Sequence, residues 1–184
     1  PPPERSTDLP FPECVSENAR ALYAIRGALV LARKGLSRLT WYFYGNTQIT
    51  ASDWDKAKGV FSRSGLASSS SAGFQNKKSL YALEDFMYVL GNTHFLSVIR
   101  EDHEAYVYLL GPNSTSPSHI VAWKPVSAED SSTTSISFSY SSWSYQSFNL
   151  GNPPLSTASL PSISNGVWTI NVQSQPIVYL LSSS

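Results

Sequence analysis

Hydrophobic and polar positions follow a helical period in the first half of the chain and a period of two in the second half. The first helical stripe recurs three or four residues apart, at Leu22, Ile25, Leu29 and Ala32. Ser16 can cap the start of this helix, and Gly35 suits the stop after its last turn. The pattern therefore predicts a helix over Ser16–Lys34. Its alanine-rich flank suggests close packing on a sheet.

A short aromatic run, Leu39–Tyr44, follows this helix, and its aromatic and β-branched residues favour a strand. A long loop over residues 45–77 leads to a second helical pattern, Ser79–Leu90, with Ser79 as its predicted cap and Gly91 at its end. The stripe predicted to be buried consists of Leu80, Leu83, Met87 and Leu90. The order helix, strand, loop and helix is typical of an α/β unit with a parallel strand. A lone parallel strand lacks a partner, so residues 1–92 are predicted to be part of a larger fold.

After Asn92 the period changes to two, and short apolar runs are separated by turn residues. The predicted strands are Phe95–Arg100, Ala105–Leu110, His119–Lys124, Ser135–Tyr140, Gly166–Val172 and Pro176–Leu181. Short strands at regular spacing indicate an antiparallel β-sandwich over residues 93–184. The fold class is therefore α/β plus all-β, with a boundary between residues 92 and 93. Trp123 and Trp168 alternate within these strands and are expected in the core.

Composition limits the partners of the chain. Only 14% of the 184 residues are charged, against about 25% in an average protein, and the formal net charge is zero. Without a basic block we expect no nucleic-acid or anionic-lipid partner. No apolar run is long enough to span a membrane. Low charge with many Ser, Thr, Tyr and Trp residues is typical of secreted proteins that handle polysaccharide.

The ends of the sequence and its single cysteine add two expectations. Cys14 has no second cysteine to pair with, so no internal disulfide supports the fold. Residues 1–5 lack the apolar segment of a signal peptide, and the chain starts without Met. We therefore expect a processed or trimmed product.

Several segments, in this order, resemble the C-terminal end of a clan A glycoside hydrolase of the xylosidase and β-glycanase type. They are Ala19–Leu22 with Arg26–Leu29, Arg38–Tyr44, Lys78–Leu83, Val121–Pro125 and Gln175–Leu180. The resemblance implies the helix after the seventh barrel strand, the eighth strand and the last barrel helix. The sandwich strands then follow. The implied fold is the end of a (β/α)8 barrel followed by an antiparallel β-sandwich.

The same resemblance implies where the chemistry lies. In that clan the two catalytic Glu residues end the fourth and seventh barrel strands, which would precede Pro1, so no catalytic residue is assigned here. A Trp near the end of the eighth strand commonly forms the floor of the substrate subsite, and Trp41 is the candidate, with Tyr44 and Asn46 nearby. Core packing is the alternative for Trp41 and Tyr44.

Trp54 is a further candidate for substrate binding. It lies between Asp53 and Asp55 in the long loop, where an aromatic ring flanked by carboxylates can line a sugar cleft. The alternative is an ordinary pair of solvated loop acids. Glu84 and Asp85 are expected on the wet side of their helix.

Other residues carry weaker signals. His94, His103 and His119 lack the spacing of metal ligands, and the sequence has no phosphate-binding loop, so no cofactor is expected. The acidic residues of the segment 101–104 are expected to form a solvated hairpin turn. Asn113-Ser114-Thr115 fits the N-glycosylation sequon, which is short and often unused.

The leading hypothesis is the C-terminal portion of a secreted glycoside hydrolase that acts on a β-linked polysaccharide. This portion would supply subsite aromatics and a sandwich, without the catalytic carboxylates. Its partners would be the polysaccharide and either the upstream part of the same enzyme or other copies of the chain. The alternative is a non-catalytic extracellular protein that binds carbohydrate or assembles into a structure.

Overall fold

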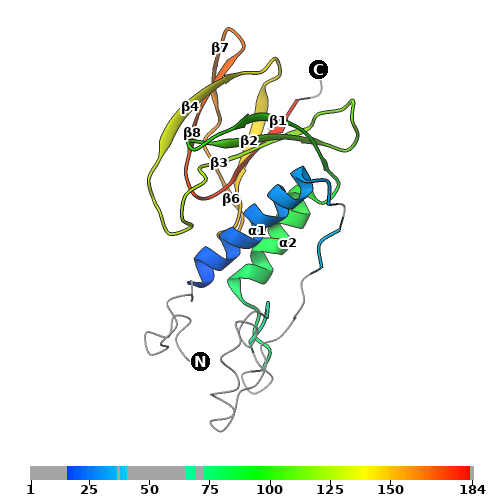
Figure 1. The fold of residues 1–184 in the computed structure, drawn as a ribbon, viewed down its shortest axis with the longest axis vertical. Helices are drawn as coiled ribbons and strands as arrows, with labels where there is room; N and C mark the ends of the chain where they lie inside the picture. The colour runs from blue at the N-terminus through cyan, green and yellow to red at the C-terminus, as the bar shows by residue number, and fades with distance from the viewer. Residues whose placement is uncertain (1–15, 37, 41–64, 69–72, 183–184) are drawn as a thin grey trace.

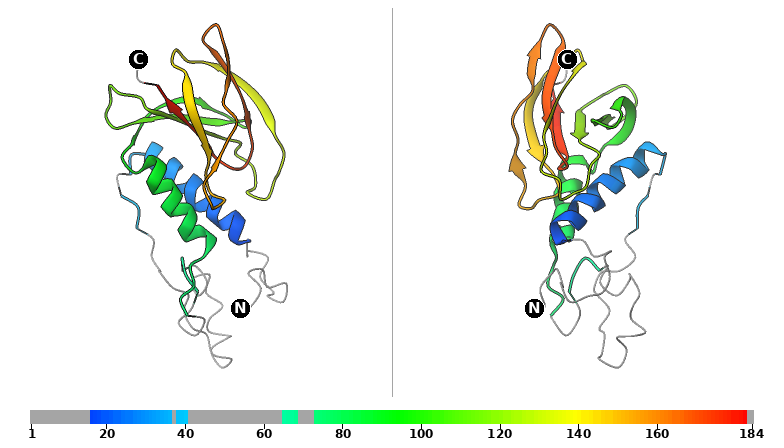
Figure 2. Two further views of the ribbon diagram at one scale, coloured as in Figure 1. Left: turned by 180° about the vertical axis from the view of Figure 1, so that it is seen from behind. Right: turned by 60° about the vertical axis from the view of Figure 1, so that its left-hand side comes forward.

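The computed structural model describes residues 16–36, 38–40, 65–68 and 73–182. These residues form three layers: two helices, a six-stranded sheet and a three-stranded sheet (Figure 1). The helices are α1 (Glu17–Arg33) and α2 (Lys78–Leu90). All views place them side by side on the same side of the strands (Figure 2).

Every paired strand of the two sheets runs antiparallel to its neighbour, which confirms the predicted antiparallel sandwich. The larger sheet has the order β1-β2-β3-β9-β5-β6 and the smaller β4-β8-β7. The strands are β1 (His94–Glu101), β2 (Tyr106–Gly111), β3 (His119–Trp123), β4 (Thr134–Ser139), β5 (Ser144–Asn149), β6 (Ser156–Thr157), β7 (Ser162–Ser164), β8 (Val167–Val172) and β9 (Ile177–Leu181). The six predicted strands are all present, while β5, β6 and β7 were not predicted.

The central strands of the six-stranded sheet, β2, β3 and β9, are buried on both faces, whereas β1, β5 and β6 have exposed positions. In β2, Val107 and Leu109 face the three-stranded sheet, whereas Tyr108 and Leu110 belong to the cluster that includes the helices. Strands β3 and β9 divide their side chains in the same way. Because neither face meets water, these strands are continuous apolar runs, the pattern expected of a sheet covered on both sides.

The three-stranded sheet buries one face only. Ile136 of β4 and Trp168 and Ile170 of β8 point into the core between the sheets. Their neighbours Ser137 and Thr169 are exposed and opposite each other, with 2.9 Å between the hydroxyl oxygens. One covered face produces the alternating pattern seen in the sequence.

The two predicted core tryptophans are both buried, in different cores. Trp123 contacts the ring of Tyr108 edge to face at 5.1 Å between centroids, on the helix side of the large sheet. Trp168 contacts Tyr179 at 5.8 Å between the two sheets, and its Nε1 donates to the carbonyl of Ser142 at 2.9 Å. The indole nitrogen therefore keeps a partner inside the core.

Helix α1 has the predicted ends. The hydroxyl of Ser16 accepts a bond from the amide of Ala19 at 3.1 Å. Gly35 adopts φ +86°, and the amide of Leu36 returns to the carbonyl of Leu31 at 3.1 Å, which completes a Schellman stop. Ala21 and Ile25 pack in the cluster shared with the large sheet, as the alanine-rich flank suggested.

Helix α2 departs from the prediction at its start and in its buried face. Lys77 occupies the N-cap position without a side-chain cap, while Ser79 is buried inside the helix. Met87 is 60% exposed, so its assignment to the buried stripe is wrong. The contact with the sheet is centred instead on Ala82, Phe86 and Leu90, because the sheet lies against that side of the helix.

The barrel part of the predicted fold is not seen in the described residues. Leu39 and Thr40, the first residues of the predicted strand Leu39–Tyr44, are exposed and form no strand. The rest of that strand lies outside the described residues. The division at residues 92 and 93 stays a prediction, although the helices and the large sheet share one apolar cluster.

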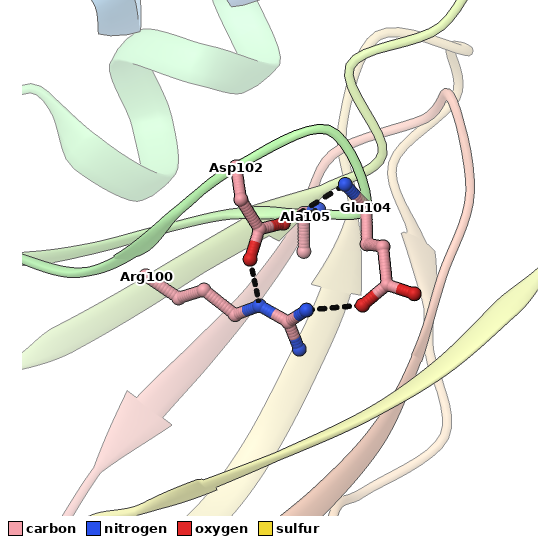
Figure 3. A network of polar contacts seen from close by, with 4 residues as sticks. All are labelled: Arg100, Asp102, Glu104 and Ala105. Atoms are coloured by element: carbon pink, nitrogen blue, oxygen red, sulfur yellow. Dashed lines mark hydrogen bonds and ion pairs between the residues drawn. The ribbon is translucent and has the colours of Figure 1, made fainter.

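The acidic turn between β1 and β2 is paired rather than simply solvated (Figure 3). The Arg100 guanidinium contacts the carboxylates of both Asp102 and Glu104. Asp102 also accepts bonds from the backbone amides of Glu104 at 2.8 Å and Ala105 at 3.0 Å. The bond from Arg100, together with these amides, lowers the pKa of Asp102 to about 2.

Glu101, the remaining acid of that segment, joins the helix layer to the large sheet. Its Oε2 accepts a bond from Nε of Arg33 at 2.5 Å and another from the hydroxyl of Tyr108 at 3.0 Å. The predicted solvated hairpin turn is present, with Asp102 and Glu104 still 38% and 46% exposed, and the cationic partner of each carboxylate is the feature that was not predicted.

Candidate functional site

The predicted substrate-binding residues Trp41, Tyr44, Asn46 and Trp54 lie outside the described residues, as do Asp53 and Asp55. Their roles stay predictions. The candidate surfaces are therefore built from the described residues alone.

Helix α2 presents an outer face that no other described element covers. Tyr81, Glu84 and Tyr88 are spaced i, i+3 and i+7, so they share one side of the helix, opposite the side that packs on the sheet. Tyr88 is 82% exposed and Tyr81 is 44% exposed. Together with the exposed Met87, these side chains form what we call the outer helix face. Such a run of large exposed side chains makes this face a candidate interaction surface.

A depression of about 340 Å³ borders this face. It is lined by Lys78, Tyr81, Glu84, Asp85, Pro153 and Pro154. Partial burial, and secondarily the charge of Glu84, raises the pKa of Asp85. Asp85 is therefore less exposed to water than predicted, whereas Glu84 is exposed as expected.

The two carboxylates of this depression do not form a hydrolytic pair. Glycosidic cleavage requires an acid and a second carboxylate that face each other across the scissile bond. Glu84 and Asp85 are adjacent on one helix and project about 100° apart around its axis. With Tyr81 beside them, they can bind a polar or sugar-like group, and they are unsuited to cleaving it.

A buried ion-pair cluster fixes the segment 65–68 to the helix starts. The carboxylate of Glu17 lies 3.4 Å from both Arg20 and Lys77. Arg20 also donates to the carbonyl of Gly65 at 2.7 Å, and the backbone amide of Lys77 donates to Leu66 at 2.9 Å. Burial lowers the pKa of Arg20, against the opposing effect of Glu17. Sequence patterns gave no sign of this cluster, because Gly65 and Lys77 are far in the chain from the helical pair Glu17 and Arg20.

A second groove, of about 380 Å³, lies at the ends of β3, β4 and β9. Its lining consists of Thr115, Ser116, Pro117, Tyr140, Ser141, Ser142, Leu181 and Ser182. The lining is uncharged and rich in hydroxyl groups, which are the partners that sugar hydroxyls use.

Two exposed aromatic residues adjoin this groove in the chain. The backbone amide of Ser182 donates to the carbonyl of Trp143 at 3.0 Å, and Trp143 is 60% exposed. Tyr145, two residues on, is 54% exposed. Exposed rings beside a hydroxyl-rich surface fit sugar stacking. Sequence analysis missed both residues, since the aromatic side chains of this segment could equally have been core.

The described residues contain no group of three or more His, Cys, Asp or Glu side chains placed to hold a metal ion. Burial lowers the pKa of His119, whose Nδ1 lies 2.7 Å from the hydroxyl of Ser118. No helix in the described ranges is both long and apolar enough to cross a membrane.

Comparison with known proteins gives structural matches only. No protein-family profile and no curated protein sequence matches this chain. A family 39 glycoside hydrolase from the gut symbiont Bacteroides cellulosilyticus WH2 matches 92% of the chain, with a TM-score of 0.67 and 17% identity. A GH30 endoxylanase from Clostridium papyrosolvens C71 and the catalytic domain of GH30 xylanase C from Talaromyces cellulolyticus each match 65%. Their TM-scores are 0.43 and 0.46, and their identities 14% and 15%.

The family 39 match shows a shared fold. The chain spans 31% of the length of that enzyme, which is therefore much larger than the present chain. The resemblance seen in the sequence, to the C-terminal part of clan A glycoside hydrolases, is thereby confirmed at the level of the fold.

Proposed function

We propose that the chain is the C-terminal portion of a secreted clan A glycoside hydrolase, in which it supplies the sandwich and the two helices that cover it. The observation that carries this proposal is the family 39 match, which extends over 92% of this chain and 31% of the enzyme. A match over nearly all of this chain and less than a third of the enzyme is what a portion of such an enzyme would give, and the sequence resemblance is to the C-terminal end.

In the intact enzyme, the outer helix face would contact the barrel. One side of α2 is already used against the large sheet, and Tyr81, Met87 and Tyr88 project from the other. Large apolar side chains gathered on a free surface favour a partner that removes them from water. An upstream barrel polypeptide supplies such a partner, and the two helices would then be shared between barrel and sandwich.

The division of chemistry follows from this arrangement. Two carboxylates that precede the chain would hydrolyse a β-linked polysaccharide. The chain itself would contribute Trp41, Tyr44, Asn46 and Trp54 to substrate binding, with no cofactor. Of the two grooves described above, only the one beside α2 is lined by carboxylates, Glu84 and Asp85, and their placement does not suit hydrolysis.

Co-expression tests this function. The 184-residue chain alone is expected to be inactive on a panel of aryl β-glycosides and polysaccharides. Adding the segment encoded upstream in the same gene should give turnover that is lost when a Glu at an upstream strand end becomes Gln. Turnover by the isolated chain would overturn the proposal if it survives repurification and disappears in Asp53→Asn or Asp55→Asn.

The exposed Trp143 and Tyr145 favour a second candidate, a non-catalytic carbohydrate-binding protein. Affinity electrophoresis in gels that contain neutral polysaccharides separates the two candidates. This candidate predicts retardation that is reduced in Trp143→Ala and Tyr145→Ala. The matched control is Leu160→Ala, an apolar residue of similar exposure on another segment. Retardation together with a gene that encodes no upstream barrel would favour this candidate over the enzyme portion.

A further inference from the structure

We propose that Asn113 is the acceptor of an N-linked glycan, and that the loop between β2 and β3 holds it in a conformation suited to glycan transfer. The sequence contains nine Asn residues, and only Asn113 is followed by any residue except Pro and then by Ser or Thr. The proposal rests on the secretory route of the proposed function, since this modification belongs to secreted proteins.

The acceptor loop is accessible. Asn113, Ser114 and Thr115 are all exposed, in the connection between the end of β2 at Gly111 and the start of β3 at His119. The loop departs from the sheet near the C-terminal end of the described chain, where the amide of Leu181 donates to the carbonyl of Ser118 (Figure 1). A glycan attached here would extend into water without displacing a buried side chain.

The side chains of the sequon are already arranged against each other. Oδ1 of Asn113 accepts one bond from the backbone amide of Thr115 at 3.1 Å and a second from the Thr115 hydroxyl at 2.9 Å. Both bonds use the carbonyl oxygen of the side-chain amide. Nδ2, the atom that would be modified, has no hydrogen-bond acceptor among the described residues and is left to solvent.

The two hydrogen bonds at Oδ1 affect the transfer of a glycan to Nδ2. Nδ2 of Asn113 would attack C1 of the first sugar of a lipid-pyrophosphate-linked oligosaccharide. An N–C bond forms, the C1–O bond to the pyrophosphate breaks, the lipid pyrophosphate leaves and an amide proton passes to a base of the transferase. An amide nitrogen is a weak nucleophile because its lone pair is delocalised onto the carbonyl oxygen. Two hydrogen bonds at that oxygen make the N–H more acidic, which helps the proton to leave.

The geometry is available before the protein folds. Both bonds join residues two positions apart, so they need no contact from the sheets. Such local side-chain turns form in isolated segments, because Asn readily bonds the backbone two residues ahead. The emerging chain can therefore present Asn113 to the transferase before β9 is available.

The attached glycan would also border the hydroxyl-rich groove. Thr115 and Ser116 belong both to the acceptor loop and to the lining of that groove. For the carbohydrate-binding candidate, glycosylated material is therefore expected to bind free polysaccharide at this groove less well than enzymatically deglycosylated material.

Translation in vitro with added microsomes tests the proposal, with a cleavable leader placed before the full 184-residue chain. We expect a single upward shift in mass that peptide N-glycosidase removes, with conversion of Asn113 to Asp. Asn113→Gln and Thr115→Ala should abolish the shift, whereas Thr115→Ser retains the hydroxyl and should keep part of it. The control Asn92→Gln, at an Asn-Thr-His segment outside any sequon, should leave it unchanged.

Two results would overturn the proposal. One is a chain that enters the microsomes, shown by protease protection, yet carries no glycan. The other is a shift that persists in Asn113→Gln. Neither result affects the assignment of the chain to a glycoside hydrolase, which depends on the co-expression assay. Likewise, a gene that encodes no upstream barrel would not change the glycosylation expected in microsomes.

Discussion

The central strands of the large sheet are buried on both faces and those of the small sheet on one, and their sequences differ accordingly. Val107 and Tyr108 are consecutive in β2 and both are buried, one against the small sheet and one against the helices. In β4, by contrast, Ile136 is buried while Ser135 and Ser137 are exposed. A strand between two layers therefore looks like an uninterrupted apolar run, and a strand on the outside looks like an alternation.

The largest expected effect comes from removing a ring from either core. Trp123→Ala and Trp168→Ala should each lower the free energy of unfolding by about 3–5 kcal/mol, because each leaves a cavity that its neighbours fill only partly. The two variants should differ in where protection from amide exchange falls first. Trp123→Ala is expected to loosen α1 and α2, and Trp168→Ala to loosen β4 and β8. Denaturant titration with hydrogen exchange checks both points. Identical exchange maps would contradict the picture of two separate cores.

A smaller effect should follow when Glu101, the partner of Arg33 from the helix layer, loses its second hydrogen bond, which lies within the large sheet. Tyr108→Phe removes the hydroxyl that donates to Glu101 and keeps the ring in place. A bond to a charged acceptor is worth about 1.5–3 kcal/mol, and a loss near the lower end is expected because Arg33 remains paired with Glu101. Tyr106→Phe, on a neighbouring half-buried ring, is the control. Equal destabilisation by both variants would exclude a specific role for the Glu101 bond.

The contributions of two carboxylates, Asp85 and Asp102, to the free energy of unfolding should depend on pH in opposite directions. Asp102 has a pKa lowered to about 2, so its contribution to stability is present above its ordinary pKa and is lost as the pH falls towards 2. The pKa of Asp85 is raised by burial, so its contribution is present below its ordinary pKa and is lost as the pH rises through the higher value.

The corresponding variants separate these signs. At pH 7, Asp102→Asn should be less stable than the parent chain, and Asp85→Asn more stable. Both differences should vanish in acid, that of Asp85→Asn below its ordinary pKa and that of Asp102→Asn near pH 2. Urea midpoints measured from pH 2 to 7 give the answer. A destabilised Asp85→Asn at neutral pH would show that this carboxylate has a partner that outweighs its burial.

The smallest effect is expected on the open face of the small sheet. Ser137→Ala removes one hydroxyl of the exposed pair with Thr169 and should change the free energy of unfolding by less than about 0.5 kcal/mol. Ile136→Ala, one residue away on the covered face, should cost about 2–5 kcal/mol. The ratio of the two losses in free energy of unfolding measures how unequally the two faces of the small sheet are buried. Comparable losses would indicate that its outer face is covered in the folded protein.

Local signals in the sequence predicted what local chemistry determines. The ends of α1 were predicted because a cap at Ser16 and a left-handed Gly35 need only nearby residues. Strand β5 was missed because the positions that it buries carry serines rather than apolar side chains. Ser144 and Ser147 are buried, with their hydroxyls bonded to the carbonyls of Gln146 and Ala158. Hydropathy cannot recognise a buried position whose polar group finds its partner inside the fold.

Tertiary placement was harder to predict than element type. The helical period of α2 defines two sides, and only the position of the large sheet decides that Phe86 is covered and Met87 is open. The candidate site was even harder to predict from the sequence. Trp41 was chosen through a family resemblance and Trp54 through its flanking aspartates, and both lie outside the described residues. Trp143 could be recognised as exposed only in three dimensions.

The place of β9 sets a condition on biosynthesis. It is the last strand in sequence, yet it lies between β3 and β5 and holds the two halves of the large sheet together. A nascent chain that has emerged from the ribosome only as far as β8 cannot close this sheet, and β3 and β5 would each keep an edge of unpaired backbone groups. Such edges recruit foreign strands. Ribosome stalling or proteolysis just before residue 177 should therefore produce aggregates rather than a smaller folded domain.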